Sequence, residues 1–292
     1  MTTTVALAQR RSIRSRLGRL PRVSGLDVMG HIALALVVVF ALLAAFGPVL
    51  APFSPNTVQL SQSYAGPTGA HLLGYDQQGR DILSRLLYGA RTSFLGPLSI
   101  VVVATVAGLV LAVAAAWRRG WFDTVLAGVL DSAMAFPGIL LAVMVVAIFG
   151  AGLTASVVAL AIAYTPYMAR IVRSAALREI SKDYVDALRV QGMSGFVICR
   201  RHVVPNVLPI VMGQAALTLA WATVDLAGLS YLGLGIQPPA ADWGVMVADG
   251  QTGVLAGYPT ESIAGGICLI VAICSFGLLG ERLLRRAEAN AA

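Results

Sequence analysis

The sequence predicts an all-α, polytopic membrane protein that crosses the bilayer six times and has both termini in the cytoplasm. Three observations lead to this fold class. Only 12% of the 292 residues are charged and 58% are hydrophobic, whereas a soluble domain carries roughly a quarter charged residues. Several stretches have the length of about 20 mostly apolar residues that a membrane-spanning helix needs. Basic residues gather in alternate segments between those stretches, as positive charges do on the cytoplasmic side.

The predicted spans share an apolar core bounded by charged residues. No charge lies between Asp27 and Asp76, which contains the first span. The stretch 124–169 is too long for one crossing, so we divide it at the glycines 150 and 152 into spans three and four. In order, the predicted spans are residues 28–50, 92–117, the two parts of 124–169, 204–234 and 262–280.

The orientation follows from the arginines before the first span. Arg10, Arg11, Arg14, Arg16, Arg19 and Arg22 precede it, and no acidic residue occurs before Asp27. Further basic residues lie in segment 178–203 and after residue 281, whereas 235–261 has none. The positive-inside rule therefore places a basic tail (1–27), segment 178–203 and a second tail (284–292) in the cytoplasm.

The segment 51–91 is the exception, because it is predicted to lie outside the cytoplasm yet carries three arginines. Asp76 and Asp81 partly offset them. We interpret residues 80–90 as an amphipathic helix lying at the membrane interface. An extracytoplasmic loop with an interfacial helix then precedes a core transmembrane domain over residues 92–283.

The net charge of +7 first suggests nucleic acid, but the arginines sit at the ends of apolar segments, so lipid is the expected partner. The histidines and cysteines have no metal-ligand spacing. The single lysine, Lys182, is not part of a phosphate-binding GxxxxGK[ST] loop, and no HExxH or GxSxG occurs. We therefore expect no enzyme and no cofactor. An ion-coupled secondary transporter or a channel subunit stays open as an alternative at this point.

Residues 181–205 form a polar segment with a helical pattern. Ser181 and Ser194 are expected to cap two short helices, with Gly192 in the turn between them, and Pro205 begins the fifth span. One face of the first helix carries Tyr184, Ala187, Leu188 and Gln191. A short exposed helix needs a partner to be stable, and a soluble protein with a groove is a suitable one. A helix resting on lipid headgroups is the alternative.

This segment resembles the EAA loop of ABC importer permeases. Asp186-Ala187-Leu188 stands at the Glu-Ala-Ala position, Gly192 at the glycine and Val204-Pro205 at the Leu-Pro position. Arg201 to Asn206 is similar to the Arg-His-x-x-Pro-Asn of the peptide-transporter branch. In that family the loop docks into a cleft on the ATPase subunit. The resemblance implies that the coupling residues are Tyr184, Asp186, Ala187, Leu188, Gly192, Arg201, His202 and Pro205.

Other motifs narrow the branch. His71 to Arg91 is similar to the LGTDxxGRDxxSRLLYGAR signature of C-type dipeptide, oligopeptide and nickel permeases, as are Ala135 to Gly138 and Tyr231 to Gly244. The resemblance runs from about residue 26 to 286. It implies a type I ABC importer permease bundle that moves di- or oligopeptides, nickel or glutathione across a bacterial inner membrane.

The resemblance also implies the partners. They are a second homologous permease subunit, two ATPase subunits that hold ATP and Mg²⁺, and an extracytoplasmic substrate-binding protein. This chain itself would bind neither a cofactor nor nucleic acid.

Three residues inside the spans are candidates for the translocation pathway: Asp131, Pro137 and Asp225. An aspartate at mid-membrane costs about 2.5–3.5 kcal/mol on insertion scales, so a functional role is the default. A hydrogen bond to a neighbouring helix or a position near the interface is the alternative. Pro137 is expected to kink its helix, either to let a gate open or simply for packing. Trp243 is expected at the membrane interface, and Arg80 and Asp81 either contact a docked binding protein or form an ion pair.

Overall fold

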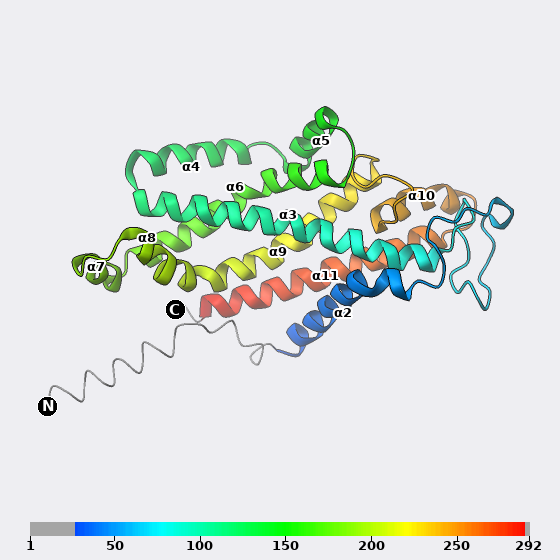
Figure 1. The fold of residues 1–292 in the computed structure, drawn as a ribbon, viewed down its shortest axis with the longest axis horizontal. Helices are drawn as coiled ribbons and strands as arrows, with labels where there is room; N and C mark the ends of the chain where they lie inside the picture. Colours follow the sequence, from blue (N-terminus) through cyan, green and yellow to red (C-terminus); the bar gives the residue numbers. More distant parts are fainter. Residues whose placement is uncertain (1–26, 290–292) are drawn as a thin grey trace.

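A computed structural model describes residues 27–289 as a bundle of helices with an irregular loop at one end (Figure 1). The expectations for residues 1–26 and 290–292 lie outside the described range. Extended pairing in that range is limited to one isolated bridge, Tyr75 to Asp81. The helices are α2 (Val28–Leu50), α3 (Ile82–Arg118), α4 (Gly120–Met134), α5 (Gly138–Phe149), α6 (Leu153–Ile180), α7 (Asp183–Val190), α8 (Gly195–Ile198), α9 (Val204–Tyr231), α10 (Trp243–Leu255) and α11 (Thr260–Ala289).

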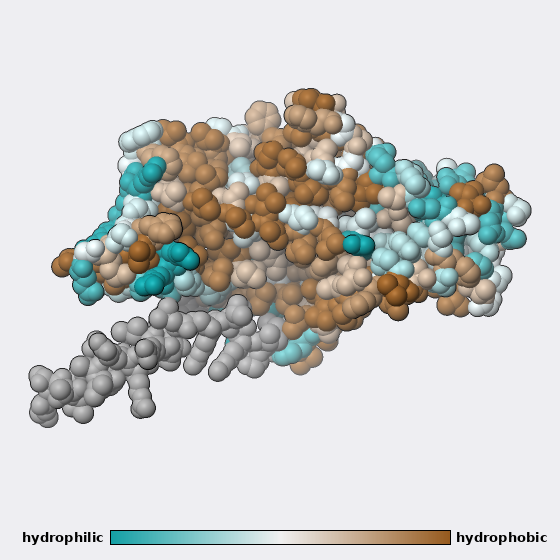
Figure 2. All heavy atoms as spheres, viewed as in Figure 1, coloured by the Kyte–Doolittle hydropathy of each residue, from teal (hydrophilic) through white to brown (hydrophobic). Residues whose placement is uncertain are grey.

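Within residues 27–289, five helical segments are long and apolar enough to cross a membrane, and the number is six if the bent pair α4–α5 counts as one span. The five are α2, α3, α6, α11 and the continuous segment Gly195–Tyr231. Apolar side chains cover the middle of the molecule while hydrophilic ones gather at its two ends (Figure 2). The all-helical, polytopic class is therefore confirmed. We call the end with α7 and α8 the hairpin end, and the end with residues 51–81 and α10 the loop end.

The second span differs from the prediction. Residues 82–118 form one 37-residue helix, α3, capped at its start by the Asp81 carboxylate, which accepts a hydrogen bond from the Ser84 N–H at 2.8 Å. The separate interfacial helix over 80–90 is therefore wrong. Its polar residues, including Ser84 and Arg85, are buried within the protein. They contact residues 53 and 55 of the loop and so do not face lipid headgroups.

The third span is broken. Helix α4 ends at Met134, α5 begins at Gly138, and the two axes meet at 82°. Pro137 stands at the break, directly before α5. A proline inside a helix removes one hydrogen bond and clashes with the carbonyl four residues earlier, which explains why the chain turns there. The predicted kink is therefore present at Pro137.

The centre of the bundle depends on close approaches between helix backbones. On α3, a Cβ added to Gly108 would lie 2.9 Å from the backbone nitrogen of Ala169 on α6. On α11, a Cβ added to Gly280 would lie 2.5 Å from the backbone nitrogen of Leu217 on α9. Small residues at such contacts let membrane helices pack tightly through van der Waals contact and interhelical hydrogen bonds.

Substituting Gly280 with leucine is therefore expected to separate α11 from α9 and to lower the thermal stability of the detergent-solubilised protein by several degrees, because overpacking costs about 1–3 kcal/mol or more. The control is Gly266→Leu on the same helix, where an added Cβ has no neighbour within 4 Å. A thermal melt of the two variants checks this. Equal melting temperatures would contradict the packing described.

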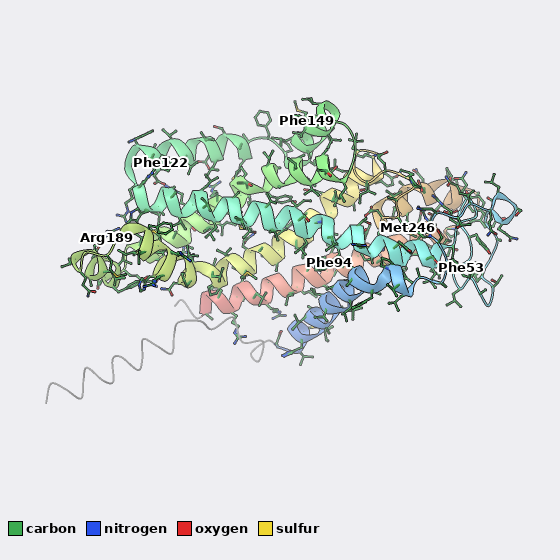
Figure 3. The ribbon with its side chains drawn as sticks, viewed as in Figure 1. Phe53, Phe94, Phe122, Phe149, Arg189 and Met246 are labelled. Carbon is green, nitrogen blue, oxygen red and sulfur yellow. The ribbon has the colours of Figure 1, made fainter. Side chains whose placement is uncertain are left out.

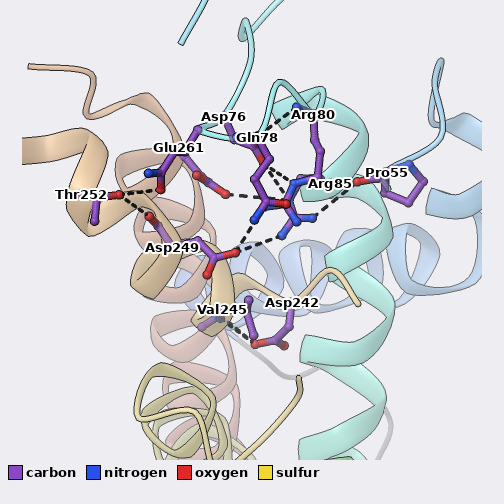
Figure 4. A network of polar contacts seen from close by, with 12 residues as sticks. Pro55, Asp76, Gln78, Arg80, Arg85, Asp242, Val245, Asp249, Thr252 and Glu261 are labelled. Atoms are coloured by element: carbon purple, nitrogen blue, oxygen red, sulfur yellow. Dashed lines mark hydrogen bonds and ion pairs between the residues drawn. The ribbon is translucent and has the colours of Figure 1, made fainter. Parts of the chain in front are cut away.

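At the loop end, five charged side chains from four segments form a buried network (Figure 4). Asp76 lies in the loop, Arg80 and Arg85 flank the start of α3, and Asp249 and Glu261 belong to α10 and α11. The Arg80 Nε donates to Asp76 Oδ2 at 2.5 Å, and the Arg85 Nε lies 3.6 Å from the same oxygen. The arginine side chains are 3% and 0% exposed. The network ties the loop to the helices, and the alternative that Arg80 forms an ion pair is confirmed.

The sequence predicted Trp243 to be an anchor exposed to lipid headgroups, but the side chain is buried within the protein at the start of α10. Its indole N–H donates to the Leu86 carbonyl at 3.0 Å, and its ring packs edge-on against Phe40. Asp242 caps the helix by accepting from the N–H groups of Gly244 and Val245. The tryptophan is therefore the anchor that fixes α10 against α2 and α3.

Candidate functional site

The polar segment between α6 and α9 folds as a helical hairpin. We call residues 181–205 the coupling hairpin. Helix α7 ends at Val190 and is followed by Gly192, which has φ +78° and donates its N–H to the Arg189 carbonyl at 2.9 Å. A residue with this left-handed backbone is most readily glycine. The predicted helix, glycine turn and second helix are confirmed in this geometry.

The coupling hairpin is fixed to the ends of α3 and α6 by an apolar cluster. Val185 from α7, Ile198 from α8 and Val203 are buried against Ala116 of α3 and Ile180 of α6. The ring of Trp117 packs on Gly195 so closely that an added Cβ would lie 2.5 Å from it. The hairpin and the ends of α3 and α6 therefore form one packed unit.

A buried carboxylate adds a polar anchor. Glu179, at the end of α6, accepts hydrogen bonds from the Tyr184 hydroxyl and the Asn206 amide, both at 2.7 Å, and pairs with Lys182 at 2.6 Å. It thus joins α6, α7 and α9. Burial and the bond to Glu179 raise the pKa of the Tyr184 phenol, so the hydroxyl stays a donor. Glu179 is absent from the predicted site because only the fold brings its partners together.

The expected serine caps are wrong. The residue before α7 is Lys182, and neither it nor Ser194 makes a side-chain capping bond. The Ser181 hydroxyl donates instead to the Arg178 carbonyl at 3.0 Å, within the last turn of α6. Helix α7 begins later than expected and is held by Glu179 and Val185 instead of by a cap.

The predicted coupling residues of α7 lie at the end of the bundle where Figure 3 labels Arg189. They divide between an anchored face and an exposed one. Tyr184 and Leu188 are half-buried against the bundle, whereas Asp186 and Ala187 are exposed. Two large apolar residues outside the predicted set are the most exposed on the hairpin: Val190 at 89% and Phe196 at 74%. A hollow of about 470 Å³ lies beside Phe196 and is lined by Phe196, Val197, Arg200 and Arg201. The free face thus combines apolar and basic groups.

The second half of the hairpin runs without a break into α9. Residues Cys199–Val203 form a π-helical turn, in which the Val204 N–H bonds to the Cys199 carbonyl. Pro205 in the first turn of α9 has no N–H, and its ring would clash with the carbonyl of Arg201 in a regular helix, which the wider turn avoids. Arg201 is exposed, and the His202 ring lies 6.4 Å from that of Tyr184.

The aspartates of the spans both have partners on α6. Asp225 on α9 accepts a hydrogen bond from the Tyr164 hydroxyl at 2.7 Å. Asp131 on α4 lies 3.7 Å from an Arg170 nitrogen. The hydrogen bond to a neighbouring helix that was considered for these aspartates is therefore present at Asp225. Arg170 was not expected as a partner of Asp131, since the two are far apart in sequence.

Two family profiles match the chain. Residues 104–289 match the binding-protein-dependent transport system inner membrane component, and residues 29–67 match the N-terminal transmembrane domain of oligopeptide transport permease C. The match over 104–289 includes both the coupling hairpin and the partners of Asp131 and Asp225.

Several characterised or named proteins are similar over most of their length. A putative peptide transport system permease protein of Brucella suis is 37% identical over 257 residues, which cover 87% of this chain and 85% of that protein. The di/tripeptide permease DppC of Pseudomonas aeruginosa (261 residues) and the glutathione permease GsiD of Pectobacterium atrosepticum (257 residues) are each 34% identical, with the same coverage.

The fold also resembles a solved structure. The inward-facing MetNI methionine ABC transporter matches with a TM-score of 0.56 and 22% identity, over 70% of this chain and 96% of that one. This likeness concerns the fold, while the profiles and relatives concern the family. The chain belongs to the binding-protein-dependent transport system inner membrane components, and it is a multi-pass permease subunit of an ABC importer.

Proposed function

We propose that this subunit pairs with a second homologous permease and two ATPase subunits to import di- or oligopeptides across the inner membrane of a bacterium. An extracytoplasmic binding protein delivers the solute. Relatives named for peptides, di/tripeptides and glutathione support this solute class. ATP and Mg²⁺ act at the partner ATPases.

The observation that carries the proposal is that the coupling hairpin has one side packed against the bundle and one side exposed. One side is packed into α3 and α6 through Val185 and Ile198. The other leaves Val190 and Phe196 exposed beside arginines. An exposed apolar residue at a loop tip is suited to a groove on another protein. A hairpin that only rested on lipid would not need the buried Glu179 anchor.

The distribution of charges supports a cytoplasmic hairpin. Arg118, Arg189, Arg200 and Arg201 gather at the hairpin end. Arg80 and Arg85 at the loop end are buried in ion pairs with carboxylates, so they present little positive charge to the membrane surface. Of the three arginines in segment 51–91, only the exposed Arg91 then still opposes the positive-inside rule.

The mechanism follows from the contacts. When ATP binding closes the ATPase subunits, the exposed face of the hairpin moves with them. Glu179 and Val185 pass that movement to the end of α6. The π-helical turn passes it to α9, which runs without interruption to the loop end. The two permeases then rock about the path between them, a rigid-body transition, and hydrolysis resets the pair.

Substitution of the P-loop lysine of the partner ATPase with alanine is expected to abolish uptake of a radiolabelled dipeptide by cells that express the whole complex, because that lysine holds the nucleotide phosphates. Collapse of the proton gradient in cells with preserved ATP should leave uptake nearly unchanged. Uptake that persists without ATP hydrolysis but stops with the gradient would instead identify an ion-coupled carrier.

A further inference from the structure

Polar side chains occupy every third position of α6 over three turns. We call Tyr164, Tyr167, Arg170 and Arg173 the α6 row; residues three apart form a ridge that crosses a helix surface obliquely. Each member contacts a polar side chain on a neighbouring helix. The pairs are Tyr164–Asp225 at 2.7 Å and Tyr167–Gln214 at 3.3 Å toward α9, and Arg170–Asp131 at 3.7 Å and Arg173–Asp123 at 2.6 Å toward α4.

Arg170 lies deep within the apolar zone of the bundle. Helix α3 carries no charge between Arg91 and Arg118, and Gly108 is close to the middle of that stretch. Gly108 packs on Met168 and Ala169, with 2.9 Å from an added Cβ to the Ala169 nitrogen. Arg170 is the next residue along the chain, so it shares this depth.

At this depth the two arginines of the α6 row form different pairs. Arg173 makes two hydrogen bonds of 2.6 Å to Asp123, the closed bidentate geometry of a structural ion pair. Arg170 makes no hydrogen bond to Asp131, and the two side chains are 64% and 62% exposed. Charged side chains inside a membrane face water or protein and not hydrocarbon. The surface around Arg170 and Asp131 is therefore not a lipid-facing one.

We propose that the α6 row, together with Asp131 and Asp225, lines the aqueous path of the solute, and that the open Arg170–Asp131 pair is its charge-selective contact. A zwitterionic solute matches this pair, because a guanidinium binds a carboxylate through parallel hydrogen bonds and a carboxylate accepts from an ammonium group. Because Arg170 and Asp131 are exposed and share no hydrogen bond, separating the two side chains to bind a solute costs little free energy. The inference rests on the proposed function, since it requires a path beside this subunit.

The test is the reactivity of a cysteine placed in the row. The native cysteines are Cys199, Cys268 and Cys274, and they are replaced by alanine in the full complex held in native membranes. Arg170→Cys is then exposed to an anionic and a cationic methanethiosulfonate reagent. We expect at least about tenfold faster labelling by the cationic reagent, because Asp131 remains beside the thiol and thiolates form in water. Adding Asp131→Asn should remove that preference.

The matched control is Val106→Cys on α3, which lies two residues from Gly108 and is exposed to a similar extent, 58%. It faces hydrocarbon in our account and should stay unlabelled. A second variant, Asp131→Cys, keeps Arg170 and should prefer the anionic reagent, so the inference stays testable if Arg170→Cys does not assemble.

An unreactive thiol at both Arg170 and Asp131, in a complex that still couples ATP hydrolysis to uptake, would overturn the path assignment and leave the proposed function intact. So would labelling as slow as that at Val106. Uptake that needs no ATP in the unmodified complex would instead contradict the proposed function, whatever the labelling pattern.

Discussion

The Gly192→Pro variant is expected to fold in the membrane, lose its ATPase subunits on purification and show no ATP-dependent uptake. Proline holds φ near −65°, whereas Gly192 has φ +78° and donates its N–H to Arg189. The turn must rearrange at a cost of about 3 kcal/mol or more, and Val190 and Phe196 leave their positions. Because an added Cβ at Gly192 has no neighbour within 4 Å, the bundle itself is not disturbed.

Gly233→Pro is the matched control for that variant. Gly233 has φ +74°, open space around it and an N–H bonded to the Ser230 carbonyl, but it follows α9 at the loop end. Its proline variant should co-purify with the ATPase subunits as the unmodified chain does. Co-purification and normal uptake by Gly192→Pro would show that the hairpin turn does not determine coupling.

Replacing Arg85 with methionine is expected to destabilise the loop end more than any other single charge removal. The Arg85 side chain is fully buried and lies 3.6–3.8 Å from Asp76, Asp249 and Glu261. Its removal leaves three carboxylates with one guanidinium, that of Arg80. Breaking a buried ionic network by removing one partner costs about 3–5 kcal/mol, so the melting temperature should fall on the order of 10 °C.

The control for Arg85 is Arg285→Met on α11. Arg285 pairs with Glu281 one turn away, with both side chains largely exposed, and such a surface pair contributes about 0–1 kcal/mol. Thermal unfolding of the two detergent-solubilised variants checks the difference. If Arg85→Met and Arg285→Met have the same melting temperature, the buried network does not hold the loop to α10 and α11.

The parts that could be predicted from the sequence are those determined by local pattern. The apolar stretches gave the spans because lipid demands length and low charge over consecutive residues. The hairpin was predictable because Gly192 and Pro205 impose backbone conformations where they stand. Pro137 marked the position of the bend, although the 82° angle depends on how α5 packs against α6.

The parts that could not be predicted depend on residues far apart in the chain. Two of the three arginines that looked misplaced in segment 51–91, Arg80 and Arg85, pair with Asp249 and Glu261, which follow them by more than 150 residues. Trp243 is a residue type typical of interfacial anchors, but its indole N–H donates a hydrogen bond to the Leu86 carbonyl inside the protein. Arg170 was overlooked because its partner Asp131 lies on another helix. Serine caps failed because tertiary contacts, chiefly Glu179, replaced them.

The most direct test of the account is a photocrosslinker in place of Val190, activated in cells that express the complete importer. If the coupling hairpin faces the cytoplasm and docks on a separate ATPase, this position should yield an adduct with the mass of the chain plus one ATPase subunit. The same crosslinker at Leu255, equally exposed at 86% but at the end of α10, should yield no such adduct. Either of two results would contradict the account: an ATPase adduct at Leu255, or no ATPase adduct at Val190 in an active importer.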